Sequence, residues 1–342
     1  MRTILVTGGA GFIGSNFVSR VFRDRPDWKI LVLDALTYAG NLSNFAPAMR
    51  DHPRFEFWYG DVNNLTLVDS LVARSDLVVH FAAESHVARS IADDRIFFQT
   101  DVMGTQSVAN AVVNHQKKVE RFVHISTSEV YGSAVREPMD EDHPLLPSSP
   151  YAAAKAGADR LVDSYVRTYD LPAVIIRPFN NYGPNQHLEK CVPRFVTSAL
   201  LGEPLELHGG GGAARDWLYV EDCVDGVLAC LEAPLDRVRG QVINLATGTA
   251  TSVKDIADEI LRIAQRPTTP KVSVGERPGQ VLLHIGDPAR AASLLGWRAR
   301  TSLREGLAKT YRWYEAHPEW WEPLRWMRQV RIHLPDGREE LH

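Results

Sequence analysis

A glycine-rich segment directly after a short apolar strand constrains the fold more than any other feature of this sequence. Ile4–Val6 predicts a buried strand, and the next residues run through GGAGFIG at positions 8–14 into a helix-like stretch that ends near Arg23. Glycine at positions 8, 11 and 14 permits a tight turn, a close approach of the backbone to a pyrophosphate, and close packing of the helix on the strand. The phosphates then lie at a helix N-terminus, which favours anions. We therefore expect a dinucleotide to contact Gly8, Gly11, Phe12, Ile13 and Gly14.

The second apolar strand carries a further sign of nucleotide binding. Trp28–Leu33 ends at Asp34, twenty positions after Gly14. A carboxylate in this place accepts hydrogen bonds from both hydroxyls of an adenosine ribose and repels a 2′-phosphate, so the sequence predicts NAD rather than NADP. A lone glycine triplet is often an ordinary turn, but here strand, helix, second strand and acid occur in the required order. We expect the remaining cofactor contacts after the third and fourth strands, from Asp61, Val62, Ala82 and Ala83.

Strand-like and helix-like segments continue to alternate along the first half of the chain. Amphipathic stretches separate apolar strands at residues 54–60, 77–83, 121–126 and 173–177. This alternation is typical of α/β proteins with a parallel sheet. We therefore predict a Rossmann-type doubly wound parallel sheet over residues 1–177, with its binding crevice at the carboxyl ends of the strands.

The pattern changes at residue 178, where Pro, Gly and Asn interrupt the alternation. We predict that residues 178–342 form mainly a smaller, mixed α/β lobe for the substrate, with some segments returning to the first domain. Loops of this part carry Lys190, Arg215 and Arg277, cations that suit a diphosphate. Taken one at a time, each is better explained as an ordinary solvated surface charge.

Composition excludes several classes of partner. The 342 residues are 44% hydrophobic and 23% charged, which is ordinary for a globular protein. The 38 Lys and Arg nearly balance the 42 Asp and Glu, which argues against nucleic acid. The longest apolar runs are far short of a membrane span, and residues 1–7 show no signal-peptide core. The three cysteines show no metal spacing, so we expect a cytoplasmic protein without a metal site.

Two short segments supply the groups for an alcohol oxidation. Thr127, Ser128 and Glu129 follow the fifth strand, and Tyr151 and Lys155 open a helix-like segment. Tyr and Lys at i and i+4 share one face of a helix, where we expect the ammonium to lower the pKa of the phenol. A phenolate then takes the proton of an alcohol while hydride leaves. Thr127 is placed to hold the same oxygen, and Glu129 suggests a second proton transfer, although Tyr–Lys pairs are also common on exposed helices.

The chain resembles the extended short-chain dehydrogenase/reductase family that remodels nucleotide sugars, and the resemblance covers essentially its whole length. Within that family it is most similar to dTDP-glucose 4,6-dehydratases. The stretches that carry this similarity are residues 7–14, 36–41, 82–87, 89–91, 180–184, 189–190, 215–222 and 277–279, together with Tyr151 and Lys155.

The resemblance implies roles for particular residues. Thr127, Tyr151 and Lys155 would oxidise C4 of the sugar. The nucleoside diphosphate would be held by Asn180, Lys190, Arg215 and Arg277. We add Ser85 and Arg89, which lie in the similar stretches, to the expected substrate-binding residues.

Several departures from the dehydratase pattern remove carboxylates. The dehydratases carry Asp where this chain has Ser128, Asp where it has Ala88, and His-Asp where it has Gln280 and Val281. In the other direction, Asp101 replaces a usual Asn on the helix behind the sheet.

Two other branches of the family carry Thr-Ser-Glu, namely GDP-mannose 4,6-dehydratases and UDP-glucuronate decarboxylases. A glucuronate substrate has a carboxylate at C6, and two like charges about 4 Å apart repel by about 4 kcal/mol at an effective dielectric constant near 20. The loss of three acids therefore favours UDP-glucuronate decarboxylase, with dTDP-glucose 4,6-dehydratase as the alternative. Known decarboxylases carry an arginine where this chain has His284, which we place with the substrate-binding residues.

Two further functions receive less support from the residues. A UDP-sugar 4-epimerase would not need Glu129, and a non-catalytic NAD sensor would not need the set of Thr127, Glu129, Tyr151 and Lys155. Family members pair two helices across a twofold axis into a four-helix bundle. The corresponding stretches here are residues 101–115 and 151–169, so we expect a homodimer.

Overall fold

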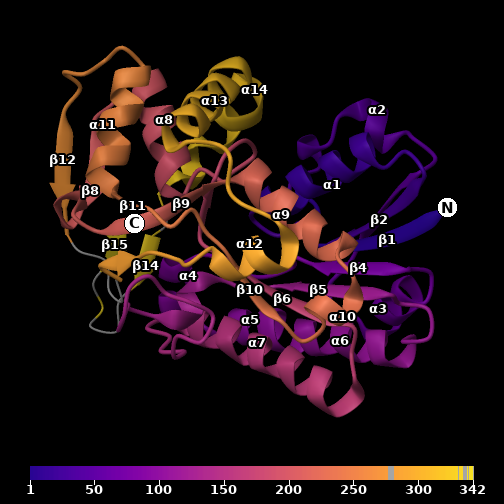
Figure 1. Ribbon diagram of the computed structural model, residues 1–342. Coiled ribbons are helices and arrows are strands. Elements are labelled where there is room, and N and C mark those ends of the chain that lie inside the picture. Colours follow the sequence, from indigo (N-terminus) through magenta and orange to yellow (C-terminus); the bar gives the residue numbers. More distant parts are fainter. Residues whose placement is uncertain (276–280, 330, 334–336, 338, 342) are drawn as a thin grey trace.

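The larger part of the molecule is a seven-stranded sheet in which neighbouring strands are parallel (Figure 1). The structure is a computed structural model that describes residues 1–275, 281–329, 331–333, 337 and 339–341. The order across the sheet is β10 (Val242–Leu245), β6 (Ala173–Pro178), β5 (Arg121–Ile125), β4 (Leu77–His80), β1 (Arg2–Thr7), β2 (Trp28–Asp34) and β3 (Phe55–Tyr59). The winding reverses between β1 and β4, which places the switch point of a doubly wound sheet beside the glycine-rich turn.

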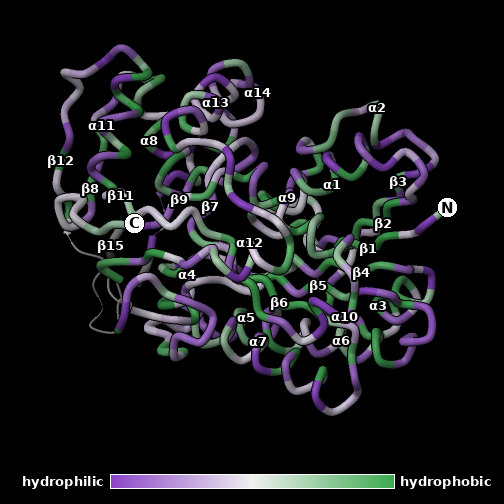
Figure 2. The backbone as a smooth tube through the Cα atoms, viewed as in Figure 1, coloured by the Kyte–Doolittle hydropathy of each residue, from purple (hydrophilic) through white to green (hydrophobic). Residues whose placement is uncertain are grey.

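Helices cover both faces of this sheet. One layer holds α1 (Phe12–Asp24), α9 (Val220–Glu232) and α12 (Ala289–Leu295), and the other holds α3 (Leu65–Val72), α6 (Gly104–Asn114) and α7 (Pro150–Tyr169). Alternate residues of β1 supply both cores, because Ile4 and Val6 pack into the first layer and Leu5 into the second. Burial on both faces explains why the strands are continuously apolar, as Figure 2 shows for the centre of the sheet.

A smaller lobe of mixed sheets and helices lies over the carboxyl end of the large sheet (Figure 1). Its central strand β9 (Ala214–Tyr219) pairs with β7 (Asn180–Tyr182), β11 (Ala250–Ser252) and β13 (Leu283–His284), and β8 (Leu205–His208) pairs with β12 (Lys271–Val274). The helices of its core are α8 (Cys191–Leu201), α11 (Val253–Ile263), α13 (Leu303–Ala316) and α14 (Pro318–Trp321).

Shorter elements complete the described chain. Before β10 they are η1 (Leu42–Asn44), α2 (Pro47–Arg50), α4 (Val87–Ala92), α5 (Arg95–Phe97), η2 (Phe98–Met103), η3 (Ser128–Tyr131), η4 (Gly209–Gly211) and α10 (Leu235–Val238). The C-terminal part adds η5 (Glu322–Arg328) and the hairpin of β14 (Arg331–His333) and β15 (Glu339–Leu341).

The predicted fold class is confirmed, with two differences of detail. The large sheet has a seventh strand, β10, which the sequence analysis did not identify. The expected helix at residues 101–115 begins as a π-helix, η2, before it becomes α6. The strand β10 and the helices α9 and α12 come from beyond residue 178 and pack on the first sheet, and the domain boundary at residues 177 and 178 stays a prediction.

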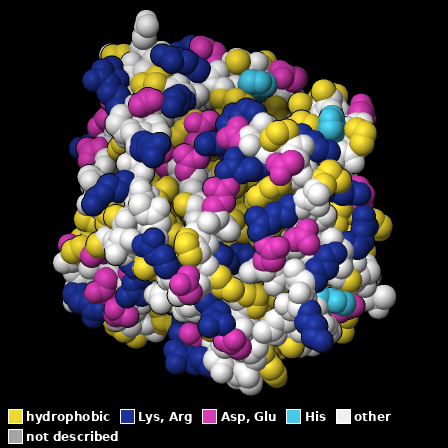
Figure 3. Space-filling view, turned by 45° about the vertical axis from the view of Figure 1, so that its right-hand side comes forward, with side chains coloured by type: hydrophobic (Ala, Val, Ile, Leu, Met, Phe, Trp, Pro, Cys, Tyr) yellow, Lys and Arg dark blue, Asp and Glu magenta, His cyan; other side chains and the backbone are white. Residues whose placement is uncertain are grey.

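The face of the molecule drawn in Figure 3 shows no patch of a single charge sign. On the face in Figure 3, Lys and Arg side chains are mixed with Asp and Glu side chains rather than gathered in one area. None of the helices in the described part of the chain is long and apolar enough to cross a membrane.

Candidate active site

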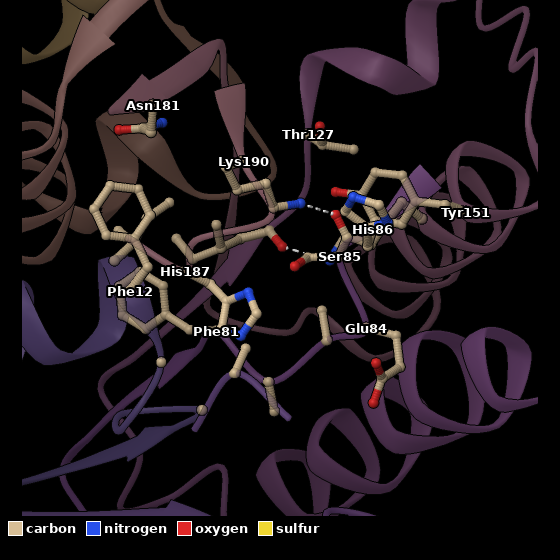
Figure 4. A pocket seen from close by; sticks show the side chains of 18 of the residues that line it. Phe12, Phe81, Glu84, Ser85, His86, Thr127, Tyr151, Asn181, His187 and Lys190 are labelled. Atoms are coloured by element: carbon tan, nitrogen blue, oxygen red, sulfur yellow. Dashed lines mark hydrogen bonds between the residues drawn. The ribbon is translucent and has the colours of Figure 1, made fainter. Parts of the chain in front are cut away.

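A cavity of about 460 Å³ lies where the loops at the carboxyl edge of the large sheet face the second lobe (Figure 4). It gathers residues that are far apart in the sequence, including every predicted catalytic residue. The predicted residues that line it are Gly8, Gly11, Phe12, Ile13, Gly14, Asp34, Asp61, Val62, Ala82, Ala83, Ser85, Thr127, Ser128, Glu129, Tyr151, Lys155, Asn180, Lys190 and Arg215.

The turn between β1 and α1 has the shape of a phosphate cradle. Gly8 has φ of +67°, and a Cβ atom on it would lie 2.4 Å from the backbone nitrogen of Ala82. A Cβ atom on Gly14 would lie 2.2 Å from the carbonyl oxygen of Gly8. No side chain caps the N-terminus of α1, where Gly11 is the N-cap, so the first N–H groups of the helix are available to an anion.

Asp34 closes the cofactor end of the cavity. Its two carboxylate oxygens accept hydrogen bonds from the backbone N–H groups of Ala10 and Leu36, both at 2.8 Å. Burial raises the pKa of Asp34, and these two hydrogen bonds act in the opposite direction. Each oxygen keeps a lone pair, so a carboxylate fixed in this way can still accept from two ribose hydroxyls. The glycine turn and Asp34 together fit the adenosine diphosphate half of NAD.

Helix α7 presents Tyr151 and Lys155 to the cavity. It begins here because Pro150 occupies its first turn and the Ser149 hydroxyl accepts from the N–H of Ala152 at 3.2 Å. The Lys155 ammonium donates to the carbonyl oxygen of Ile125 at the end of β5, at 2.7 Å. This hydrogen bond ties the helix to the strand that delivers the Thr-Ser-Glu segment.

The pKa of Tyr151 is raised, in contrast to the expected lowering by Lys155. Burial is the largest cause, and the negative charges of Asp101 and Glu129 act in the same direction. A hydrogen bond with Thr127 acts against them. Lys155 does not provide the expected effect because its own pKa is lowered by burial and its ammonium is directed to a backbone carbonyl. Burial therefore disfavours the phenolate that the spacing of Tyr151 and Lys155 predicts.

Asp101 is a fully buried carboxyl group behind this pair. One oxygen accepts from the backbone N–H of Glu84 at 2.8 Å, and the other has no hydrogen-bond partner in the described chain. Burial raises the pKa of Asp101 while the positive charge of Lys155 opposes that shift. Asp101 lies in the π-helical segment η2, a type of irregularity that is frequent at functional sites.

The Thr-Ser-Glu segment forms η3, a short helix that starts where β5 ends. Thr127 is its N-cap, and its hydroxyl accepts from the N–H of Glu129 at 3.2 Å. Ser128 is 2% exposed, whereas the Glu129 side chain is 21% exposed and faces the cavity. Burial lowers the pKa of the Arg215 guanidinium, and the nearby negative charge of Glu129 opposes that shift.

The predicted substrate-binding residues occupy four different situations. Ser85, Asn180, Lys190 and Arg215 line the cavity, and the Lys190 ammonium donates to the Ser85 carbonyl at 2.6 Å (Figure 4). Arg89 lies behind the lining, where it donates to Glu189 at 3.1 Å. The other two behave differently: His284 is fully buried beside Glu129 rather than lining the cavity, and Arg277 lies outside the described residues.

Several lining residues were not predicted. They include Gln186, His187, Glu189 and Trp217, which come from the loop before α8 and from β9. Glu189 and Trp217 lie in stretches that resemble the dehydratases, whereas the only signal for Gln186 and His187 is their closeness to Lys190 in the sequence. Ser128, Ala88 and Val281, the described positions at which this chain lacks a carboxylate, all line the cavity.

Comparisons with known proteins identify the family. The family model for GDP-mannose 4,6 dehydratase matches residues 5–310. A dTDP-glucose 4,6-dehydratase of Streptomyces antibioticus is 43% identical over 330 residues, which are 94% of this chain and 95% of the relative. The low-salt glycan biosynthesis protein Agl12 of Haloferax volcanii is 42% identical over 312 residues, 91% of this chain and 98% of the relative. This chain belongs to the nucleotide-sugar 4,6-dehydratase family.

A solved member of the dehydratase family has the same fold. DesIV, a dTDP-glucose 4,6-dehydratase from Streptomyces venezuelae, superposes with a TM-score of 0.89 at 41% identity, covering 94% of this chain and 100% of that chain. That structure has NAD bound, which agrees with the cofactor predicted from the glycine turn and Asp34. The relatives favour a dehydratase, which was the alternative function in the sequence analysis, over a decarboxylase.

Proposed function

We propose that this chain is an NAD-dependent dTDP-glucose 4,6-dehydratase. The observation that carries the proposal is the identity of about 40% to dTDP-glucose 4,6-dehydratases over nearly the full length of both chains. The cavity supports the proposal, because the Tyr151–Lys155 pair for oxidation and the separate carboxylate of Glu129 all line it. A dehydratase needs both, whereas a 4-epimerase has no use for Glu129 and a non-catalytic sensor needs neither.

The residues divide the reaction between them. Tyr151 accepts the proton of the sugar 4-hydroxyl, and Thr127 holds the same oxygen. When bound, NAD accepts the hydride from C4 and later supplies one to C6, which no side chain can do. Once C4 is a ketone the proton at C5 is acidic, and Glu129 removes it so that the 6-hydroxyl leaves as water. The diphosphate of the substrate is held by Lys190 and Arg215, with Arg277 as a further expected contact.

The experiment that tests this function is the product mass after incubation with dTDP-glucose. We expect the sugar to lose the mass of one water and to become a 4-keto-6-deoxy product. Incubation with UDP-glucuronate, followed by measurement of released CO2, is the parallel assay. An enzyme that ignores dTDP-glucose and releases CO2 from UDP-glucuronate would contradict the proposal.

UDP-glucuronate decarboxylase is the second candidate because of the missing carboxylates. Ser128, Ala88 and Val281 line the cavity without adding negative charge. A C6 carboxylate would meet less repulsion here than beside the acids of the dehydratase pattern. His284 gives this candidate no support, since burial lowers its pKa and a neutral imidazole cannot replace an arginine.

We further expect the protein to form a homodimer in the cytoplasm. The helical region around η2 carries exposed apolar side chains, with Phe98 43% and Met103 54% exposed. These side chains would be covered if η2, α6 and α7 packed against the same helices of a second copy. A monomeric mass by light scattering at micromolar concentration would contradict this expectation.

A further inference from the structure

One ring nitrogen of His284 makes a hydrogen bond, and the other faces Glu129. Its Nε2 atom lies 2.6 Å from the carbonyl oxygen of Gly132. A carbonyl can only accept, so Nε2 carries a hydrogen and donates it. The other nitrogen, Nδ1, is buried without a hydrogen-bond partner in the described chain and lies 3.9 Å from Oε1 of Glu129. No other carboxylate is recorded within ion-pair distance of this ring in the described part of the chain.

The surroundings hold this arrangement in place. His284 belongs to β13, where it stands opposite Arg215 of β9. Asp216 of β9 anchors the end of β13 by accepting from the backbone N–H of Gly286 at 3.3 Å. The ring of Phe179 packs edge-on against His284 at 6.0 Å between centroids. The ring therefore has little freedom to turn Nδ1 away from Glu129.

While Glu129 is ionised and His284 is neutral, no proton lies between Nδ1 and Oε1, and the pair can take up one. The two facing lone pairs repel, so uptake of that proton, on Glu129 or on the imidazole, stabilises the pair and makes Glu129 a stronger base. The charged and titratable groups that face His284 are Glu129, which favours the imidazolium, and Arg215 and His143, which oppose it. The separation of 3.9 Å must shorten by about 1 Å, or be bridged by one water, for the proton to pass.

We propose that His284 is a positioning residue that shares a single proton with Glu129 and thereby lets one carboxylate act as both base and acid in the elimination. This inference rests on the proposed dehydratase function. Glu129 takes the C5 proton of the 4-keto sugar, and the electrons of that C–H bond form the enolate. His284 holds the proton through Nδ1 while the enolate forms. The pair then returns it to the 6-hydroxyl, the C6–O bond breaks, the C5–C6 double bond forms and water leaves, so protons and electrons balance and the pair is reset.

The shared proton explains how the site works without the Asp expected at Ser128. Serine cannot supply a proton to a leaving hydroxyl at neutral pH. A Glu129 without a partner would have to exchange its proton with water between the two steps. With His284 behind it, the proton stays on the pair between the two steps, because Nδ1 of His284 is buried.

The first test needs no substrate and no cofactor. We would follow the imidazole nitrogens of the ¹⁵N-labelled protein by NMR as a function of pH, assigning His284 by its loss in His284→Gln. We expect the Nε2–H tautomer, and we expect Glu129→Gln to lower the pKa of His284 by about 1–3 units because an opposite charge at this distance favours the imidazolium. His143 is the internal reference, since its nitrogens are engaged by Val135 and Pro144. An unchanged pKa of His284 in Glu129→Gln would overturn the proposal whatever the enzyme does.

The second test separates the two half-reactions. Gln at position 284 keeps a donor for the Gly132 carbonyl but cannot take up a proton, so we expect normal formation of reduced nicotinamide and a loss of roughly 100-fold in product formation. The matched control, His143→Gln, changes an equally buried histidine that does not contact Glu129, and we expect it to leave both steps within about threefold. Equal loss of both steps in His284→Gln, or no loss of either, would contradict the proposal. If dTDP-glucose is not a substrate, the NMR result still decides the question.

Discussion

The oxidation end of the cavity, at Tyr151 and Lys155, and the elimination end, at Glu129, are assembled from the sequence in different ways. At the oxidation end, Tyr151 and Lys155 stand one helical turn apart on α7, with the buried Asp101 behind them. At the elimination end, Glu129 comes from η3 and its buried partner His284 from β13, more than 150 residues later. Both ends place a buried titratable group behind a reactive one, but only the Tyr151–Lys155 pair is encoded by local spacing. An end assembled from distant strands can change its chemistry by single substitutions without disturbing the helix that performs the oxidation.

The largest effect should come from Tyr151→Phe. The variant lacks the group that accepts the 4-hydroxyl proton, so oxidation should fall by roughly 10³-fold, and elimination with it, because C5 becomes acidic only after C4 is a ketone. Binding of the nucleotide sugar should stay close to normal by calorimetry, since Phe keeps the ring. A variant that still accumulates reduced nicotinamide on mixing with substrate would remove Tyr151 from this role.

Asp34→Ala should affect both ends equally, because it acts on the cofactor and not on the sugar. We expect NAD affinity to fall by roughly 10–100-fold, through the lost charged hydrogen bonds to the ribose, and the gap between NAD and NADP to narrow. Dissociation constants for both cofactors, measured on the apoprotein, check this. A wild-type protein that binds NADP more tightly than NAD would contradict the role assigned to Asp34.

Asp101→Asn should change the oxidation step and leave the elimination step as it is. The amide keeps an acceptor for the Glu84 N–H but removes the negative charge that raises the pKa of Tyr151. Oxidation requires the deprotonated phenol, so its rate rises as pH passes that pKa. A lower pKa shifts the rise to lower pH, and the rate below it increases by up to roughly tenfold. The pH profile of the first half-reaction, measured by rapid mixing, should shift in this direction, and a shift to higher pH would contradict the account.

Ser128→Asp should have the smallest effect, confined to the elimination end. For a neutral glucose substrate the new acid restores the dehydratase pattern, so turnover of dTDP-glucose should stay within about threefold or rise. For a glucuronate substrate the same change brings back the repulsion with the C6 carboxylate and costs a few kcal/mol. Ser128→Asn, of equal size and without charge, is the matched control. A large loss with Asp but not with Asn would favour the decarboxylase.

The oxidation end could be predicted from the sequence because its determinants are local. The turn at Gly8, the acid at Asp34 and the Tyr151–Lys155 spacing each act within a few residues of a strand or helix end. All of them line the cavity. The direction of the Tyr151 pKa was wrong because it depends on burial and on Asp101, neither of which helical spacing reveals.

The elimination end could be predicted only in part. Glu129 was found from its place after β5, but the position of His284 depends on the pairing of β13 with β9, a contact between strands that no local pattern encodes. The strand β10 was missed for a similar reason. Val242–Leu245 is a short apolar run that becomes a sheet edge strand only by pairing with β6.

The most direct measurement is a single turnover of Glu129→Gln with dTDP-glucose, followed by both nicotinamide absorbance and product mass. If the two ends act separately, the variant should form reduced nicotinamide at nearly the wild-type rate and then stop, because Tyr151 and Lys155 are intact while the C5 proton has no acceptor. Product formation should fall by roughly 10²–10⁴-fold. A variant that releases the 4-keto-6-deoxy product at the wild-type rate, or that fails to reduce the nicotinamide, would contradict the division of the cavity into these two ends.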